Sequence, residues 1–359
     1  MPELRNPLGM FSVFLKSRKT IRELNHTIEN NYIMMKKLTI LICFLILTFS
    51  ATYPVEAQEK IAEKSLKEGL FMLHEIDMHV HAGKERPLSL DQWIDMFIHD
   101  GRKVLLLLDH LELYRMSGKE REGWIKKNKV SDWYPDSTSA RKEFMKELES
   151  VENRKDILAF RGWEIWEGEI DEGLDKAPMR DAEVISWHMS KAAWSGKAPG
   201  GKELIIRARQ IVEIQKEFPV PMIIFHPFAG RIKAVKDAAV KSGRDISSIT
   251  REEYRYFTPE EQKELTKILA GRSVYIEIER GWSGLWNEQP VREAFIEDIR
   301  PLAEGGVKFT ISTDAHGKES FNTPYDPEKY CNDLGITSEN VNAIIRELLS
   351  FRAKRNLGK

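Results

Sequence analysis

Seven short apolar runs, separated by amphipathic segments, most strongly constrain how this 359-residue chain can fold. They predict strands near 71–78, 103–108, 157–164, 183–187, 220–225, 273–278 and 307–312, with helices at 89–99, 138–150, 202–217, 259–270, 290–303 and 338–354. Thr258-Pro259-Glu260-Glu261 is a typical helix start, with a threonine cap and proline in the first turn. Strands that alternate with helices indicate parallel βα units. The chain is therefore expected to form a closed barrel or a doubly wound sheet.

Charge and cysteine content narrow the possible functions. The 55 basic and 56 acidic side chains give a formal net charge of −1, so the broad basic surface of a nucleic-acid-binding protein is absent and no nucleic-acid partner is expected. The two cysteines, Cys43 and Cys331, are too few for a disulfide framework or a cysteine-rich zinc module. A metal ion in this protein would have to be held by histidine, aspartate and glutamate.

Residues 1–57 are predicted to be a leader. Met34-Met35-Lys36-Lys37 is followed by uncharged, mostly apolar residues 38–49 and by the small-residue site Val55-Glu56-Ala57, which is the order of a secretory signal peptide over 34–57. Residues 1–33 would then precede the true start. Because a membrane span needs about 20 apolar residues, we expect cleavage after Ala57 and export to the periplasm or the exterior, with no stable membrane span. The alternative is an uncleaved N-terminal anchor.

Histidines and carboxylates gather where the predicted strands end. The histidines are His79, His81, His110, His188, His226 and His316, and the carboxylates are Asp77, Asp109, Glu164 and Asp314. The carboxyl ends of barrel strands meet at one mouth, where active sites are built. His79 and His81 are two residues apart on a strand, so their imidazoles point to one face and can reach one ion. The sequence therefore predicts a metal site at the mouth, although one such histidine alone is more often structural.

Five ordered motifs resemble the PHP family, named for polymerase and histidinol phosphatase. They are Asp77-Met78-His79-Val80-His81, Leu108-Asp109-His110, Gly162-Trp163-Glu164, His226-Pro227 and Thr313-Asp314-Ala315-His316. The resemblance covers residues 74–317. The resemblance implies a distorted TIM-like (β/α)7 barrel, here a single domain over 58–359, with two or three divalent metal ions. Imidazole and carboxylate ligands suit zinc, manganese or iron. The resemblance further implies that His79, His81, Glu164 and Asp314 hold one ion, that Glu164, His188 and His226 hold a second, and that His110 and His316 hold a third.

The chain departs from the family pattern after the first histidine pair. The family usually has a Ser-Asp-Gly-like turn there, whereas this chain reads Ala82-Gly83-Lys84-Glu85-Arg86-Pro87. Glu85 is the candidate substitute ligand, and His188 is assigned by position alone. The nearest competing family, the amidohydrolases, also begins with a His-x-His strand but normally has no histidine two residues after its last-strand aspartate. Asp77 and Asp109 are expected to accept hydrogen bonds from ligand histidines and so orient them.

The predicted function is an exported metal-dependent hydrolase, a phosphoesterase that uses a metal-activated hydroxide on a small, anionic phosphate ester. Arg280, after the sixth strand, is a candidate to bind an anionic oxygen, or else an ordinary surface arginine. The basic segment 111–136 is a lid or a solvated loop, and tryptophans 163, 166, 282 and 286 line the substrate site or pack the loops. The alternatives are a carboxylic or carbamate ester hydrolase on the same metal site and a metal-binding barrel without turnover.

Overall fold

A computed structural model describes the part of the chain that carries the predicted βα units. The described residues are 70–83, 88–115, 119, 122–123, 126, 137–189, 200–228, 230–281 and 285–357. The predicted leader and Glu85 lie outside them. Residues 65–359 form one compact unit.

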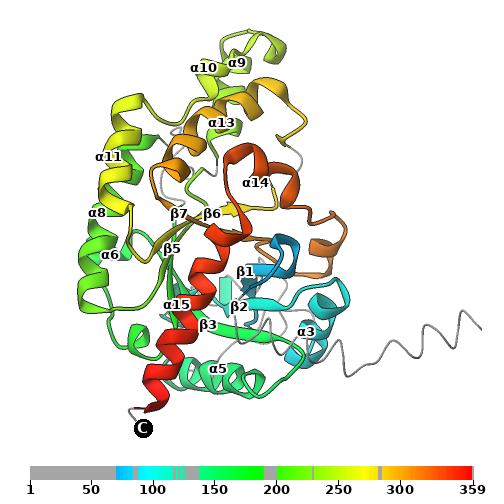
Figure 1. Cartoon of the computed structure of the whole chain (residues 1–359), viewed down its shortest axis with the longest axis vertical. Coiled ribbons are helices and arrows are strands. Elements are labelled where there is room, and N and C mark those ends of the chain that lie inside the picture. The colour runs from blue at the N-terminus through cyan, green and yellow to red at the C-terminus, as the bar shows by residue number, and fades with distance from the viewer. Residues whose placement is uncertain are drawn as a thin grey trace, which may run out of the picture. The chain divides into compact units, whose positions relative to one another are not determined.

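Seven parallel strands follow one another around a barrel in chain order (Figure 1). They are β1 (Ile76–His81), β2 (Val104–Leu108), β3 (Leu158–Trp166), β4 (Val184–His188), β5 (Met222–Phe225), β6 (Val274–Glu279) and β7 (Lys308–Ser312). A seam remains between β1 and β7, where Ala315, just beyond β7, exchanges backbone hydrogen bonds with β1: His81 donates to Ala315 at 3.0 Å and Ala315 donates to His79 at 3.3 Å. The predicted α/β class and the distorted (β/α)7 barrel are thus confirmed.

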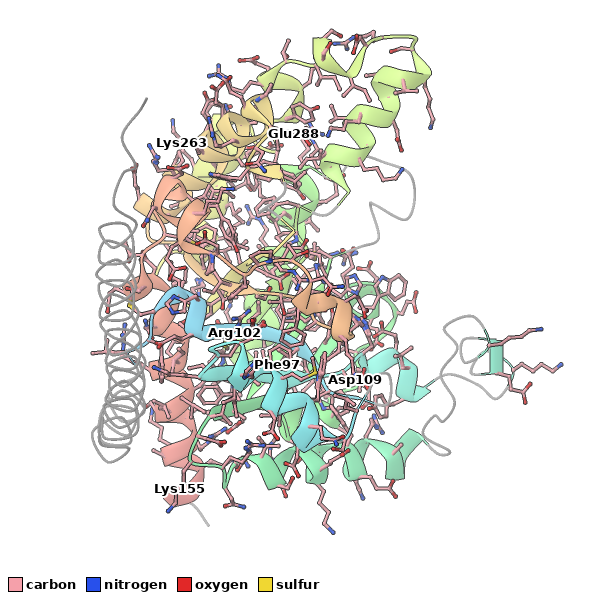
Figure 2. All side chains as sticks on the ribbon, turned by 90° about the vertical axis from the view of Figure 1, so that its right-hand side faces the viewer. Phe97, Arg102, Asp109, Lys155, Lys263 and Glu288 are labelled. Carbon is pink, nitrogen blue, oxygen red and sulfur yellow. The ribbon has the colours of Figure 1, made fainter. Side chains whose placement is uncertain are left out.

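Helices connect the strands and cover the outside of the barrel. The longer ones are α3 (Leu90–His99), α5 (Ser137–Val151), α8 (Gly201–Glu217), α9 (Arg231–Lys241), α11 (Pro259–Leu269), α13 (Gln289–Glu304) and α15 (Ser338–Leu357). Helix α11 has the predicted capping box, in which Thr258 and Glu261 exchange side-chain and backbone hydrogen bonds. Charged side chains such as Lys155 and Lys263 point away from the unit (Figure 2). Across the described residues, no helix combines the length and apolarity that a bilayer span requires.

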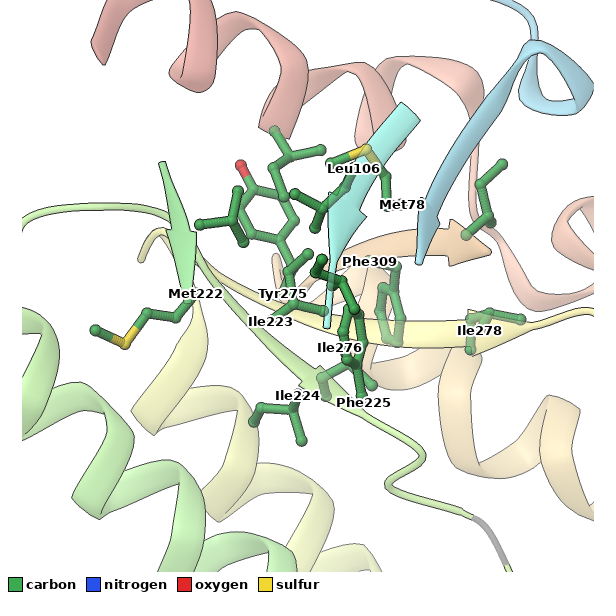
Figure 3. Close-up of a cluster of buried hydrophobic side chains, with 14 of the residues drawn as sticks. Met78, Leu106, Met222, Ile223, Ile224, Phe225, Tyr275, Ile276, Ile278 and Phe309 are labelled. Carbon is green, nitrogen blue, oxygen red and sulfur yellow. The ribbon is translucent and has the colours of Figure 1, made fainter. Parts of the chain in front are cut away.

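The strands are buried on both faces, as expected for a parallel sheet between a barrel interior and helices. All residues of β2, Val104–Leu108, are buried. Alternate residues of β5 face opposite ways, so Ile223 and Phe225 lie among the strands while Met222 and Ile224 point toward the helices (Figure 3). The apolar runs therefore supply both the interior of the barrel and the layer beneath the helices.

Two predicted segments need correction. The first strand was expected over 71–78 but begins at Ile76, because Leu73–Glu75 forms a 3-10 turn in which the Glu75 carboxylate accepts the backbone N–H of Met72 at 2.9 Å. Between β5 and α11 the chain also forms an unpredicted helical insertion, comprising α9, the turn η4 (Ile246–Ser248) and α10 (Arg251–Tyr254). This insertion borders the carboxyl end of β5.

Candidate metal centre

Strand ends bring eight of the nine predicted metal ligands to the mouth of the barrel. His79 and His81 lie in β1, Glu164 lies in β3 and His188 ends β4, while His110, His226, Asp314 and His316 follow β2, β5 and β7. All eight contribute to groups whose ligand atoms lie within 4.8 Å of one another. The ninth, Glu85, lies outside the described residues. Clusters that can hold metal ions are thus present where the sequence places them.

Glu164 lies at the centre of the cluster and is fully buried. Its Oε2 atom is 3.1 Å from His110 Nδ1 and 3.3 Å from His81 Nε2. Its Oε1 atom is 3.4 Å from His188 Nδ1. The two oxygens therefore face imidazoles of different strands, as expected of a carboxylate that bridges two ions.

Asp314 faces the first histidine pair from the opposite side of the seam. Its Oδ1 atom lies 3.2 Å from His79 Nε2 and 3.3 Å from His81 Nε2, and those two nitrogens are 3.1 Å apart. Its Oδ2 atom is 3.7 Å from His226 Nε2. Nitrogen and oxygen donors that converge in this way suit zinc and other transition metals.

The hydrogen bonding of the carboxylates shows whether these residues fit a cation. Within the described part of the chain, both Glu164 oxygens and Asp314 Oδ1 are buried and accept no hydrogen bond. A buried charged oxygen without a hydrogen bond is costly and needs a compensating charge. The adjacent imidazole nitrogens point at the same space. The residues therefore fit one or more metal ions.

Backbone strain marks two of the candidate ligands. Among the described residues other than glycine, only His226, with φ 52°, and Asp314, with φ 53°, have positive φ. Such conformations cost free energy and cluster at functional sites, where the surroundings hold them in place. The His226 backbone N–H donates to Glu277 at 2.8 Å, and Thr313 donates to Asp77 through its N–H at 2.9 Å and its hydroxyl at 2.6 Å.

Two glutamates of β6 that the sequence analysis missed support the histidines. Glu277 Oε1 lies 2.7 Å from His79 Nδ1, and Glu279 Oε2 lies 2.8 Å from His226 Nδ1. These contacts fix which ring nitrogen of each histidine faces the cluster. The signal was available, because Glu277 and Glu279 alternate at the end of an otherwise apolar strand and so share one face.

The expected role of Asp77 is not what the structure gives it. Its carboxylate accepts from the Thr313 backbone and hydroxyl and from the His79 backbone N–H at 3.4 Å, with no imidazole partner among the described residues. The reason is the seam, where β1 lies beside the residues that follow β7. Asp77 therefore fixes the backbone just before Asp314 instead of orienting a histidine ring.

Asp109, labelled in Figure 2, is buried and directly follows β2. It accepts the Tyr114 hydroxyl at 2.7 Å and the His110 backbone N–H at 2.9 Å, and its Oδ1 atom is 3.9 Å from His81 Nδ1. Only glycine fits at Gly83, since a Cβ there would lie 1.6 Å from Asp109 Oδ2. Asp109 thus positions the loop of His110 and lies beside the His81 ring.

Two of the residues proposed for substrate contact, Arg280 and Trp163, have partners other than the clustered ligands. Arg280 donates from its guanidinium to the Ser320 carbonyl and contacts none of the clustered ligands among the described residues. Trp163 is buried and packs against Tyr114 and Phe144, with ring centroids 5.2 and 5.3 Å away. Trp282 and most of segment 111–136 lie outside the described residues. Trp163 is therefore a core residue.

The protonation states of the metal-free cluster follow from the carboxylates and imidazoles that lie close together in it. Burial opposes a charged His79, but Asp314, Glu277 and Glu164 outweigh it and raise the pKa of His79 to about 9. Burial likewise opposes a charged His110, yet Glu164 and Glu112 raise its pKa to about 9. The same histidines hold the pKa of Glu164 well below its usual range, against its burial. Without a metal, protons on imidazole neutralise the carboxylates, and a divalent cation would displace those protons.

Comparison with known proteins adds little. No protein-family model and no curated protein matches the chain. Among solved structures, the chain is similar to a chain of the cryo-EM structure of archaeal ribonuclease P with mature tRNA, with a TM-score of 0.43 and 12% identity over 77% of this chain and 90% of that chain. A similarity at this level does not bear on function.

Proposed function

We propose that this protein is a metal-dependent hydrolase of the PHP type, with a phosphate ester of a small molecule as substrate. The observation that carries the proposal is the buried Glu164 carboxylate, which accepts no hydrogen bond within the described residues and faces imidazoles from several strands. A purely structural carboxylate at this depth would be hydrogen-bonded. Two or three zinc, manganese or iron ions are proposed as its partners.

Divalent ions bound here would supply a hydroxide near neutral pH and a positive charge for the oxygens of a phosphoryl group. The chain's own residues prepare that chemistry. Glu277 and Glu279 hold the rings of His79 and His226 by their Nδ1 atoms, so that Nε2 of each faces the cluster. Asp77, through Thr313, fixes the strained backbone that presents Asp314. A site held in place before substrate binds requires little reorganisation during reaction.

The resemblance of the sequence motifs to the PHP family supports phosphate esters over other substrates. Carboxylic or carbamate esters are the alternative, because the same nucleophile attacks an acyl carbon. Export is proposed from the leader alone. Mass spectrometry of protein from the native host should then find a mature terminus near Gln58 in an exported fraction, and a full-length cytosolic chain would contradict it.

A substrate screen tests the proposal. The protein is loaded in turn with zinc, manganese and iron and assayed against aryl phosphates, phosphodiesters and carboxylic esters. We expect hydrolysis of a phosphate ester that chelation abolishes and added metal restores. Turnover of carboxylic esters alone would favour the alternative, and binding of metal without turnover of any ester would contradict the hydrolase assignment.

A further inference from the structure

A cavity of about 610 Å³ opens beside the metal centre, between the end of β5, the insertion helix α9 and the end of β6. We call it the lateral cavity. Its inner end is formed by His226, Glu277 and Glu279, the groups that form or support the cluster. Its volume lies within the range of small-molecule sites. His226 is the one predicted metal ligand among the described lining residues, so a molecule bound beside His226 has room to extend toward α9.

The walls of the lateral cavity are apolar. They include Phe228, Ile232, Ile246, Leu285 and Phe295. Phe228 is buried and makes edge-to-face contacts with Tyr256 and Phe295, with ring centroids 5.0 and 5.8 Å away. Ile246, in contrast, is 46% exposed although it is a large apolar side chain. Apolar surface left open to a cavity is typical of a ligand site.

Each cation at the cavity has a carboxylate partner. Lys233 pairs with Asp237 at 2.5 Å, and Lys236 pairs at 2.7 Å with Glu288, which is labelled in Figure 2. Among the described lining residues, no lysine or arginine is without a carboxylate partner, and Glu277 and Glu279 add negative charge at the inner end. The cavity therefore disfavours a second anionic group on the ligand.

The wall is fixed to the metal centre by hydrogen bonds. Tyr256, two residues after the insertion, donates its hydroxyl to the Pro227 carbonyl at 2.7 Å, next to the strained His226. Arg231, at the start of α9, donates to the carbonyls of Glu253 and Arg255 at 3.0 and 2.7 Å. Hydrogen bonds thus join the start of α9 to the end of α10 and hold the insertion beside His226, a candidate ligand. The cavity is therefore formed before any substrate binds.

We infer that the lateral cavity binds an uncharged, apolar group of ring size on the substrate, so that the substrate is an aryl or bulky alkyl ester with a single anionic centre. This inference rests on the proposed function, because the cluster is taken to bind the ester. The insertion α9–α10 then selects the substrate by its apolar group, and polyanionic esters such as nucleotides and sugar bisphosphates are disfavoured.

Titration calorimetry of the zinc-loaded protein tests the inference with two probes that carry the same anionic group, phenylphosphonate and methylphosphonate. Burial of a ring in an apolar cavity should make phenylphosphonate bind at least about tenfold more tightly. Ile246→Asp places a charge in the cavity and should remove most of that preference. Val240→Asp is the matched control, since Val240 is a 58% exposed residue of the same insertion that does not line the cavity.

Each outcome decides the matter. Equal affinity for the two probes, no binding of either, or a preference that survives in Ile246→Asp would overturn the inference. A preference lost in Ile246→Asp and kept in Val240→Asp would support it. Hydrolysis is measured separately. Preferential binding of phenylphosphonate without turnover of any ester would contradict the hydrolase proposal and leave the cavity inference intact. Hydrolysis of esters together with equal affinity for the two phosphonates would support the hydrolase proposal and contradict the cavity inference.

Discussion

Glu183 and Glu164 are both fully buried glutamates of one sheet, yet their surroundings differ. Glu183 directly precedes β4 and accepts from the Arg352 guanidinium at 2.7 and 2.6 Å and from the Arg161 backbone N–H at 3.2 Å. Glu164, near the carboxyl end of β3, accepts no hydrogen bond within the described residues and faces imidazoles. The chain pairs the first carboxylate with a permanent cation of its own, whereas it surrounds the second with imidazoles, whose protons a metal ion can displace.

The difference separates stability from function within one barrel. Arg352 lies in α15, and its guanidinium donates to the Ala159 carbonyl of β3 at 2.7 Å as well as to Glu183. These hydrogen bonds hold α15 against the strands. A buried carboxylate satisfied in this way serves the fold. The Glu164 cluster instead retains buried carboxylate oxygens that accept no hydrogen bond within the described residues, and strained backbone at His226 and Asp314. Such costs are tolerated at functional sites.

The largest effect is expected for Glu164→Gln. The amide keeps the size of the side chain but replaces a charged oxygen with a poor ligand, so kcat should fall by several orders of magnitude, roughly 10³-fold or more. The circular dichroism spectrum should remain that of the wild type. Near-normal turnover at saturating metal would remove Glu164 as the bridge and shift that role to Asp314 or Glu85.

Glu183→Gln should act in the opposite way. It weakens a buried ion pair, so the free energy of unfolding should fall by about 3 kcal/mol, the low end for breaking such a pair. Metal content and kcat at saturating metal should stay near those of the wild type. Urea unfolding measures the first quantity and a steady-state assay the second. If Glu183→Gln lost bound metal but kept its stability, the distinction between a structural Glu183 and a metal-binding Glu164 would be wrong.

The metal-free protein should lose stability as the pH rises. Because the folded-state pKa values of His79 and His110 are raised to about 9 from 6.5, their protonation stabilises the fold fully below about pH 6.5, and that stability is lost as the pH rises through about 9. Saturating zinc should remove this dependence, since metal replaces the protons. Urea unfolding at pH 6 and pH 9.5 measures it, and His110→Ala should reduce it. If the free energy of unfolding were the same at these two pH values, the raised pKa values of His79 and His110 would be contradicted.

Arg280→Ala should have the smallest effect. Its guanidinium already donates to the Ser320 carbonyl, so at most a several-fold rise in KM with little change in kcat is expected. Lys263→Ala, on the outer face of α11, is the control. If kcat fell by more than about 100-fold, Arg280 would belong to the reacting centre after all.

Much of the barrel could be predicted from the sequence, because burial on both faces leaves continuous apolar runs such as Val104–Leu108. The first strand was misplaced because Glu75 caps a turn locally, an interaction that apolar patterning does not register. The insertion was missed for a related reason. Helix α9 buries Ala239 alone along its length, so it lacks a strong apolar face.

The candidate site could be predicted as far as strand ends define it. His79, His81 and Glu164 meet because parallel strands bring their carboxyl ends together. The left-handed backbone of His226 and Asp314 could not be predicted from the sequence, because it depends on partners that are distant in the chain. Glu277 accepts from the His226 backbone, and Asp77 accepts from Thr313, next to Asp314. Glu277 and Glu279 were visible as alternating residues of the strand, but the sequence analysis assigned them no role.

Elemental analysis of the purified protein tests the central claim most directly. The wild type should contain two or three transition-metal ions per chain, the double variant His79→Ala, His81→Ala should lose at least one, and Glu183→Gln should keep them all. Metal content that is absent in the wild type, or unchanged by removing the histidine pair, would show that the cluster is structural and would contradict the account.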